Sequence, residues 1–286
     1  MAEGLVSVEG LTERPLPPAL GAKVTSYPDG LRVVLFRSGQ RGAAVTAAGS
    51  VRDADSSSGT SERSISSSDA AERLSSSIAR SRRLVVHRAR SLNPCAMWTF
   101  TRRGKFESSA DAWAVWARFA RLMRLRFGAG WRYVAVPELH GDGETWHLHV
   151  LVDRFYMVET LRVLWQRALG GTGQERGDQT LGNVHVKASR TRRASARRFA
   201  AYVSKYVGKG FERSGANRRV FAASVGLRPI AATRWHCPYD IGLGEFIDSF
   251  ERWLRESFGV ARFWPRILVR ESWECAIADC PLPAAA

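Results

Sequence analysis

The stretch WRYVAVPELHGDGETWHLHVLVD, from Trp131 to Asp153, constrains the fold more than any other part of the sequence. Two runs of β-forming residues, Trp131–Glu138 and Trp146–Asp153, flank a turn that contains two glycines. Runs of this kind on either side of a glycine-containing turn predict a β-hairpin. Because side chains alternate across a strand, His147 and His149 share one face of the second strand.

Further strand and helix patterns surround this hairpin. We expect a strand at Ala96–Thr101, helices at Ser109–Phe127 and Val158–Leu169, a strand at Asn183–Ala188 and a helix at Ser195–Gly210. The order is β-α-β-β-α-β-α, and its first six elements follow the split βαβ pattern. The sequence therefore predicts an α+β fold. We expect a ferredoxin-like, RRM-like βαββαβ core, with an antiparallel sheet, two helices on one face and an extra C-terminal helix that carries two tyrosines.

The chain divides by composition into three segments. We expect residues 1–90 to form an N-terminal extension, residues 91–226 the folded domain, and residues 227–286 a helical C-terminal extension. Gly39–Arg83 is rich in Ser, Ala, Gly and Arg and has few apolar residues. It cannot bury enough surface to offset its ordering entropy, so we expect it to be largely disordered, with at most a transient helix near Ser67–Ile78.

Two shorter patterns lie in the terminal segments. LRVVLF, at Leu31–Phe36, is typical of a strand, and GEFIDSFERWLRESFG, at Gly244–Gly259, is typical of an amphipathic helix. We assign neither of them a place in the predicted sheet.

The charge of the chain favours a polyanionic partner. Lys and Arg number 43 against 27 Asp and Glu, which gives a formal net charge of +16. A surplus of this size favours nucleic acid first. No apolar run approaches the roughly 20 residues of a membrane helix, so we expect no membrane partner. The four cysteines form no CxxC pair, a pattern typical of reduced thiols in a cytoplasm.

The hairpin carries a candidate metal site. Glu138 ends the first strand, and its carboxylate can reach the face that carries His147 and His149. Two imidazoles and one carboxylate suit a divalent metal that keeps open positions. His140 and Asp142, in the turn, compete with Glu138 as the third ligand. The alternative is a solvated strand face that happens to hold two histidines.

The last predicted helix carries a candidate nucleophile. Tyr202 and Tyr206 are four residues apart and so lie on one helix face. Lys205 and Lys209 each follow a tyrosine by three residues. A tyrosine oxygen can act as a covalent nucleophile, especially beside a lysine or a metal-bound phosphate. The alternative is that the pair packs against the sheet.

A basic stretch precedes the tyrosines. Its arginines are Arg190, Arg192, Arg193, Arg197 and Arg198. A charged helix face is often only solvated. In a chain with this surplus of positive charge we expect contacts with DNA phosphates.

Together these residues resemble the HUH endonucleases, in particular the rolling-circle replication initiation proteins of bacterial phages or plasmids. The resemblance covers about Asn93–Val225 and rests on four motifs in order. These are Thr99 and Thr101 in a Thr-rich strand, His147-Leu148-His149, the Tyr202, Lys205 and Tyr206 helix, and NRRVFAAS at Asn217–Ser224.

The resemblance implies a mechanism. His147, His149 and Glu138 would hold Mg²⁺ or Mn²⁺ at the scissile phosphate. Tyr202 or Tyr206 attacks the phosphorus, which leaves a 5′-phosphotyrosine and a free 3′-OH that primes replication. The reverse attack rejoins the strand, so the enzyme is a DNA-nicking endonuclease and strand transferase. We expect Tyr202, assisted by Lys205, to attack first, and Thr99, Thr101, Lys209 and the arginines to contact DNA.

The resemblance also implies partners and a location. The substrate is single-stranded or supercoiled origin DNA in the cytoplasm of a bacterial host. The sequence has no GxxxxGK[S/T] run, so we expect a host helicase to unwind the DNA and a host polymerase to extend the 3′ end.

Three alternatives stay open from the sequence. A conjugative relaxase would combine His140 with His147 and His149 and use an early tyrosine, for which Tyr27 is the candidate. A tyrosine-pair transposase would use the same helix. A noncatalytic RRM-like module would need aromatic residues on the sheet where this chain has histidines.

Overall fold

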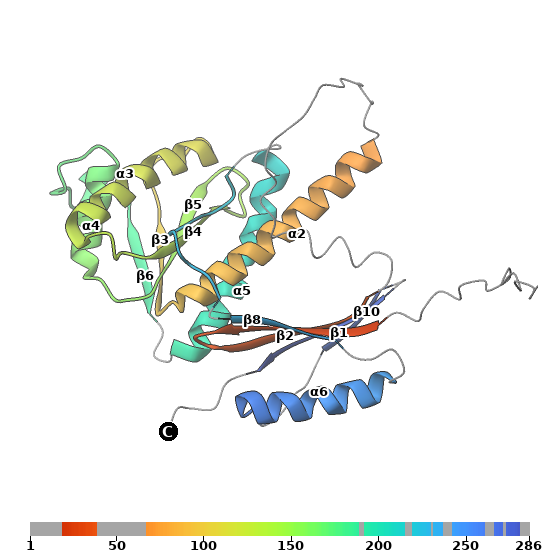
Figure 1. Cartoon of the computed structure of the whole chain (residues 1–286). Coiled ribbons are helices and arrows are strands. Elements are labelled where there is room, and N and C mark those ends of the chain that lie inside the picture. Colours follow the sequence, from red (N-terminus) through yellow and green to blue (C-terminus); the bar gives the residue numbers. More distant parts are fainter. Residues whose placement is uncertain are drawn as a thin grey trace, which may run out of the picture. The chain divides into compact units, whose positions relative to one another are not determined.

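The computed structural model describes residues 19–38, 67–188, 192–214, 219–229, 231–236, 242–260, 266–270 and 273–280 (Figure 1). The chain forms two compact units. Unit 1 consists of Met1–Thr25, Leu31–Ser56 and Ala232–Ala286, and unit 2 of Ser26–Gly30 and Ser57–Ala231. Both ends of the chain therefore contribute to unit 1, which differs from the three consecutive segments expected from the sequence.

Unit 2 is built on a five-stranded antiparallel sheet in the order β6-β3-β5-β4-β7. The strands are β3 (Ala96–Phe100), β4 (Tyr133–Leu139), β5 (Trp146–Val152), β6 (Val184–Ala188) and β7 (Ala222–Ala223). β4 and β5 form the predicted hairpin. β5, which carries both histidines, lies between β3 and β4.

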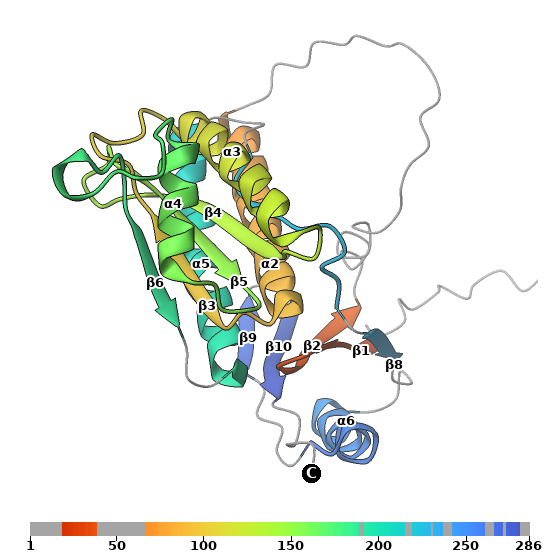
Figure 2. The same ribbon diagram turned by 90° about the vertical axis from the view of Figure 1, so that its left-hand side faces the viewer.

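One face of this sheet packs against helices α3 (Ser109–Phe127) and α4 (Val158–Ala168) (Figure 2). The Ser108 hydroxyl caps α3 by accepting a hydrogen bond from the Asp111 amide at 3.2 Å. The interface is aromatic: Phe100 of β3 lies 4.8 Å from Phe119 and 4.6 Å from Trp165 between ring centroids. Burial of these rings fixes the face of β5 that points away from the histidines.

The opposite face is covered by helices α2 (Ser67–Leu92) and α5 (Arg192–Ser214), so the sheet lies between two helical layers (Figure 1). α2 was not expected in the fold. Its last turns bury Val85, Ala89 and Leu92 against the sheet. These residues lie just beyond the apolar-poor window that ends at Arg83, which explains why a stable helix was not predicted. The stretch 39–66, also expected to be disordered, lies outside the described residues.

Unit 1 holds a second five-stranded sheet, in the order β8-β1-β2-β10-β9. Its strands are β1 (Ala19–Tyr27), β2 (Gly30–Ser38), β8 (Ala231–His236), β9 (Arg266–Arg270) and β10 (Trp273–Cys280). Helix α6 (Leu243–Phe258) packs on β1 and β2 through Phe246, Phe250 and Leu254. The apolar side chains of β1 and β2 alternate, and every second one lies in this core.

The α+β class expected from the sequence is confirmed. The amphipathic pattern at Gly244–Gly259 is α6, and Leu31–Phe36 lies within β2. The C-terminal segment 227–286 contains β8, β9 and β10 besides α6, so it is not only helical. A short 3-10 helix, η1 (Gly177–Gln179), completes the described elements.

Candidate functional site

His149 lies at the centre of the site face of the sheet, the face covered by α2 and α5. In the sheet it is flanked by Thr99 of β3 and Val136 of β4, and its side chain is buried. The Thr99 Oγ1 lies 3.1 Å from Nδ1 of His149. On the other side of the ring, Nε2 contacts Oε2 of Glu138. Both ring nitrogens therefore have a partner, which fixes the orientation of the imidazole.

His147 lies on the same face, directly opposite Glu138 in the register of the hairpin. It is half-buried. Burial lowers the pKa of His147, and His140 and His149 lower it further, against the opposing effect of Glu138. The neutral imidazole, which is the form that binds a metal, is thus favoured at His147.

The two competing third ligands lie in the hairpin turn. His140 is exposed, with its ring centroid 5.3 Å from that of His147. The Asp142 carboxylate accepts hydrogen bonds from the Thr145 hydroxyl at 2.6 Å and from the Thr145 and Glu144 amides, both at 2.9 Å. These bonds hold the pKa of Asp142 well below its usual range. Asp142 is engaged in shaping the turn, whereas Glu138 lies on the site face beside His149.

α5 places both tyrosines against His149. Its buried residues Phe199, Ala200, Val203 and Val207 pack on the sheet. The Tyr206 ring stacks on His149 with 5.1 Å between centroids, and the Tyr202 ring meets it edge-on at 5.7 Å. The two tyrosine rings are 4.9 Å apart. The alternative that the tyrosines only pack against the sheet thus applies in part, but the residue they pack against is the candidate metal ligand.

The two tyrosines differ in environment. The Tyr202 side chain is 39% exposed. Tyr206 is half-buried, and burial raises its pKa, as do a hydrogen bond with the Tyr202 side chain and the charge of Glu138. Tyr206 therefore retains its proton more firmly than a free tyrosine does.

The donor set was tested for its fit to a divalent cation. Within the described part of the chain, no three His, Cys, Asp or Glu side chains are grouped closely enough to hold a metal ion. Glu138 and His149 contact each other directly, and His147 lies beside them on the face. The chemistry of the set does fit: two imidazoles and a carboxylate on one face, with the inner imidazole oriented by a hydroxyl. Which ion binds stays a prediction.

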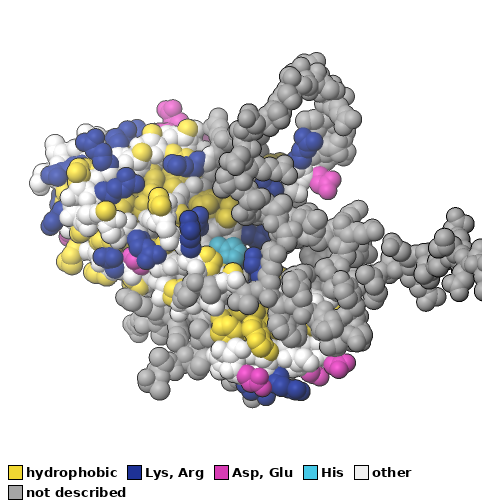
Figure 3. Space-filling view, in the orientation of Figure 1, with side chains coloured by type: hydrophobic (Ala, Val, Ile, Leu, Met, Phe, Trp, Pro, Cys, Tyr) yellow, Lys and Arg dark blue, Asp and Glu magenta, His cyan; other side chains and the backbone are white. Residues whose placement is uncertain are grey.

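The predicted phosphate contacts lie in different places. Arg190 is outside the described residues, and Arg192, Arg193 and Lys209 belong to α5 with undescribed side chains. Arg198 and Lys205 are exposed. Histidine side chains reach the surface with Lys and Arg side chains beside them (Figure 3).

Two expected DNA contacts are engaged within the protein. Arg197 is half-buried, with Nε 3.5 Å from Oδ2 of Asp29 and a bond to the Asp29 carbonyl, so its guanidinium is used there rather than at a phosphate. Thr99 holds His149. Thr101 follows β3, where its backbone pairs with Asn183 and its carbonyl accepts a bond from Trp165 Nε1.

Sequence reasoning did not find the partners of the site. Asp29 and Arg90 form a buried ion pair beside Arg197, and no local pattern in the sequence links Asp29 to either arginine. Tyr27, the alternative early nucleophile, is fully buried, and its hydroxyl contacts Nδ1 of His87. The alternative in which Tyr27 attacks DNA is therefore not supported.

The fold and the site define an α+β domain in which a tyrosine-bearing helix packs on a His-x-His strand. Residues 95–211, from the start of β3 into α5, match the family model of the replication-associated protein ORF2. This segment belongs to that family of phage rolling-circle replication proteins in the HUH superfamily, so the resemblance seen in the sequence is confirmed. The chain matches no curated protein and no solved structure significantly.

Family membership gives the chain a place in DNA replication and implies DNA binding. None of the helices in the described ranges is both long enough and apolar enough to cross a bilayer.

Proposed function

We propose that the protein initiates rolling-circle replication by nicking and rejoining one DNA strand at an origin. The observation that carries this proposal is the contact of both α5 tyrosine rings with His149, which itself contacts Glu138. A nucleophile and a candidate metal-binding pair thus lie within one side-chain cluster on a rigid sheet. Such proximity is the main requirement for a phosphoryl transfer, because the protein has to position and neutralise rather than react.

Tyr202 is the first nucleophile in this proposal. Its oxygen attacks the scissile phosphorus, the bond from phosphorus to the 3′ oxygen breaks, and the strand is left with a free 3′-OH. The tyrosine proton passes to water, which reaches Tyr202 because the side chain is 39% exposed. The 5′ phosphate stays bound to Tyr202, and attack by the 3′-OH on this linkage reverses the reaction.

Tyr206 serves the later strand transfer. Its raised pKa and partial burial make it the less accessible nucleophile while Tyr202 is free. Once Tyr202 is linked to DNA, Tyr206 is the next hydroxyl on the same helix face. Lys205, exposed one turn beyond Tyr202, supplies positive charge near the phosphate.

His147, His149 and Glu138 would hold Mg²⁺ or Mn²⁺. A divalent cation bound there supplies charge neutralisation at the scissile phosphate as negative charge builds up. Thr99 and the opposed Glu138 keep the His149 ring oriented for this role. Phosphate contacts fall to Arg198 and, where the chain places them suitably, to Arg190, Arg192, Arg193 and Lys209.

The order of elements supports the finer description of the fold. β3-α3-β4-β5-α4-β6 alternate along the chain, and the sheet order β6-β3-β5-β4 has antiparallel neighbours throughout. This is the order expected of a ferredoxin-like core, with β7 and α5 added. We propose further that the protein acts in a bacterial host cytoplasm with a host helicase and polymerase.

The test is covalent trapping. The protein is incubated with Mn²⁺ and single-stranded or supercoiled origin DNA, and products are separated under denaturing conditions. We expect a protein–DNA adduct that the double variant Tyr202→Phe, Tyr206→Phe does not form and that His147→Ala forms much more slowly. An adduct that survives both changes would sink the proposal, and a noncatalytic binding module would shift DNA without any adduct.

A further inference from the structure

The N-terminal half of α2 carries a basic face that the family match does not cover. The matched segment begins at residue 95, whereas this half of α2 precedes it. Arg73, Arg80 and Arg83 are exposed along it, with Ser76 and Ser77 between the first two arginines. Because these side chains lie beyond the turns that pack on the sheet, the core does not account for them.

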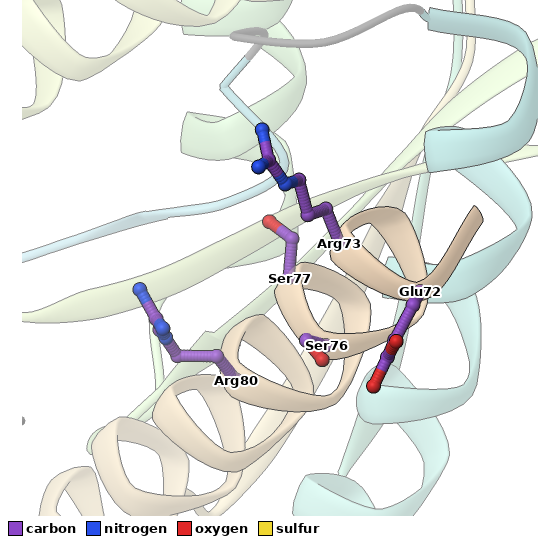
Figure 4. A pocket seen from close by; sticks show the side chains of 5 residues that line it. All are labelled: Glu72, Arg73, Ser76, Ser77 and Arg80. Atoms are coloured by element: carbon purple, nitrogen blue, oxygen red, sulfur yellow. The ribbon is translucent and has the colours of Figure 1, made fainter. Parts of the chain in front are cut away.

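Helical spacing gathers these residues on one side. At 3.6 residues per turn, Arg73, Ser77 and Arg80 fall within an arc of about 60°, and Ser76 and Arg83 lie beside it. Figure 4 shows the side chains of Arg73, Ser77 and Arg80 projecting from the same side of α2, while Glu72 points away from them. The Glu72 carboxylate therefore does not neutralise the arginines.

This side of α2 is hollowed. A depression of about 600 Å³ is lined by Glu72, Arg73, Ser76, Ser77 and Arg80 (Figure 4). Guanidinium groups and hydroxyls are the donors that bind phosphate oxygens in nucleic-acid complexes. The size and lining of the depression suit a phosphodiester group with its sugar.

The arginines lack internal counter-charges. Over the part of the chain that the structure describes, no carboxylate lies within ion-pair distance of Arg73, Arg80 or Arg83. Exposed arginines on other helices do have such partners: Arg162 lies 2.6 Å from Glu159 and Arg255 lies 3.3 Å from Glu251. Arg80 and Arg83 are three residues apart, where like charges destabilise a helix. An external polyanion would relieve this repulsion.

The spacing also fits a DNA strand. Seven residues of helix rise by about 10 Å, so Arg73 and Arg80 are separated by about three times the roughly 3.4 Å rise per phosphate of one strand. Each arginine can thus contact a separate phosphate. We propose that this face of α2 binds the phosphate backbone of the substrate DNA, independently of base sequence and outside the nicking site. The proposal rests on the proposed function only in naming DNA as the polyanion.

The test is the salt dependence of DNA binding by the full chain. The probes are a fluorescein-labelled oligonucleotide of mixed sequence, as a single strand and as a duplex. Each lost phosphate contact lowers the slope of log K against log salt by about 0.9 for duplex and about 0.7 for single strands. For Arg73→Gln, Arg80→Gln we expect the slope to fall by about 1.8 if the face binds duplex, or about 1.4 if it binds a single strand.

The matched control removes the same charge from another exposed helix. Arg121→Gln, Arg124→Gln on α3 should keep the wild-type slope, and Arg73→Lys, Arg80→Lys should restore it because the charge is retained. An unchanged slope in the α2 glutamine variant overturns the proposal, as does an equal loss in the α3 variant. Because binding is measured without cleavage, either result leaves the test of the tyrosine nucleophiles unaffected.

Discussion

At the scale of single residues, His149 is held at both ring nitrogens by side chains from neighbouring strands. Thr99 lies at Nδ1 and Glu138 at Nε2. Sheet alternation predicted that His147 and His149 share a face, and the predicted hairpin brought Glu138 near them. The role of Thr99 was not predicted, because it depends on which strand pairs with β5 on its other side. That pairing joins residues about fifty positions apart.

Thr99→Val tests the orienting role of this hydroxyl. Partners that orient a ligating histidine typically contribute 10–100-fold to metal affinity or activity, so we expect a loss of about that size in the affinity for Mn²⁺. The measurement is a Mn²⁺ titration followed by calorimetry. Thr180→Val is the control, since the Thr180 hydroxyl donates to the nearby Gly177 carbonyl, away from the site. Equal affinities in wild type and Thr99→Val would contradict the role.

At the scale of elements, α2 and α5 are joined by a buried ionic cluster. Asp29, in the turn between β1 and β2, is fully buried. Arg90 of α2 donates from Nε to both of its carboxylate oxygens at 3.1 Å, and Arg197 of α5 lies 3.5 Å from one of them. Arg90 also lies 4.2 Å from the centroid of the Tyr27 ring. The cluster thus anchors the helix that carries the tyrosines.

Asp29→Ala should be strongly destabilising. It leaves two guanidinium groups next to each other, one of them fully buried, and breaking a buried pair in this way typically costs about 3–5 kcal/mol. Urea unfolding monitored by circular dichroism measures the change. Glu159→Gln, which breaks the exposed pair with Arg162, should cost less than about 1 kcal/mol. Similar losses in the two variants would show that the cluster does not anchor the helices.

The loop after α4 makes a pH-dependent contribution to stability. Hydrogen bonds from its own backbone amide, from Thr172 and from Gly173 lower the pKa of Glu175 to about 2 from its usual 4.5. A depressed folded-state pKa stabilises the fold above the unfolded pKa, and this contribution is lost as the pH falls toward the folded value.

Glu175→Gln should therefore lower the melting temperature near neutral pH. The difference from wild type should shrink as the pH falls from about 4.5 toward 2. Thermal unfolding across this range, with Glu107→Gln as a control for an exposed carboxylate, measures it. A difference that stays constant down to the lowest pH would contradict the linkage.

At the scale of the whole molecule, local periodicity predicted the elements from residue 96 to 210 with errors of a few residues at their ends. α3 has the bounds expected, and β3, β5 and α4 differ by one residue at an end. The sheet of unit 1 was not predicted. In it, Leu31–Phe36 of β2 pairs with Cys275–Cys280 of β10, and a pairing across almost the whole chain leaves no local signal.

The charge of the chain, in contrast, was informative for the whole molecule. A surplus of +16 pointed to a nucleic-acid partner, and the family match places the chain in DNA replication. The charge did not show which arginines are available to DNA. Arg197 is used inside the protein, whereas Arg73 and Arg80, in a stretch expected to be disordered, are exposed on a helix.

The most direct measurement of the central claim is the identity of the residue that becomes linked to DNA. The adduct formed with Mn²⁺ and origin DNA is digested with nuclease and protease, and the modified peptide is sequenced by mass spectrometry. The account predicts a nucleotide on Tyr202 after a single turnover, and on Tyr206 only after strand transfer. A nucleotide on any residue outside this pair, Tyr27 included, would contradict it.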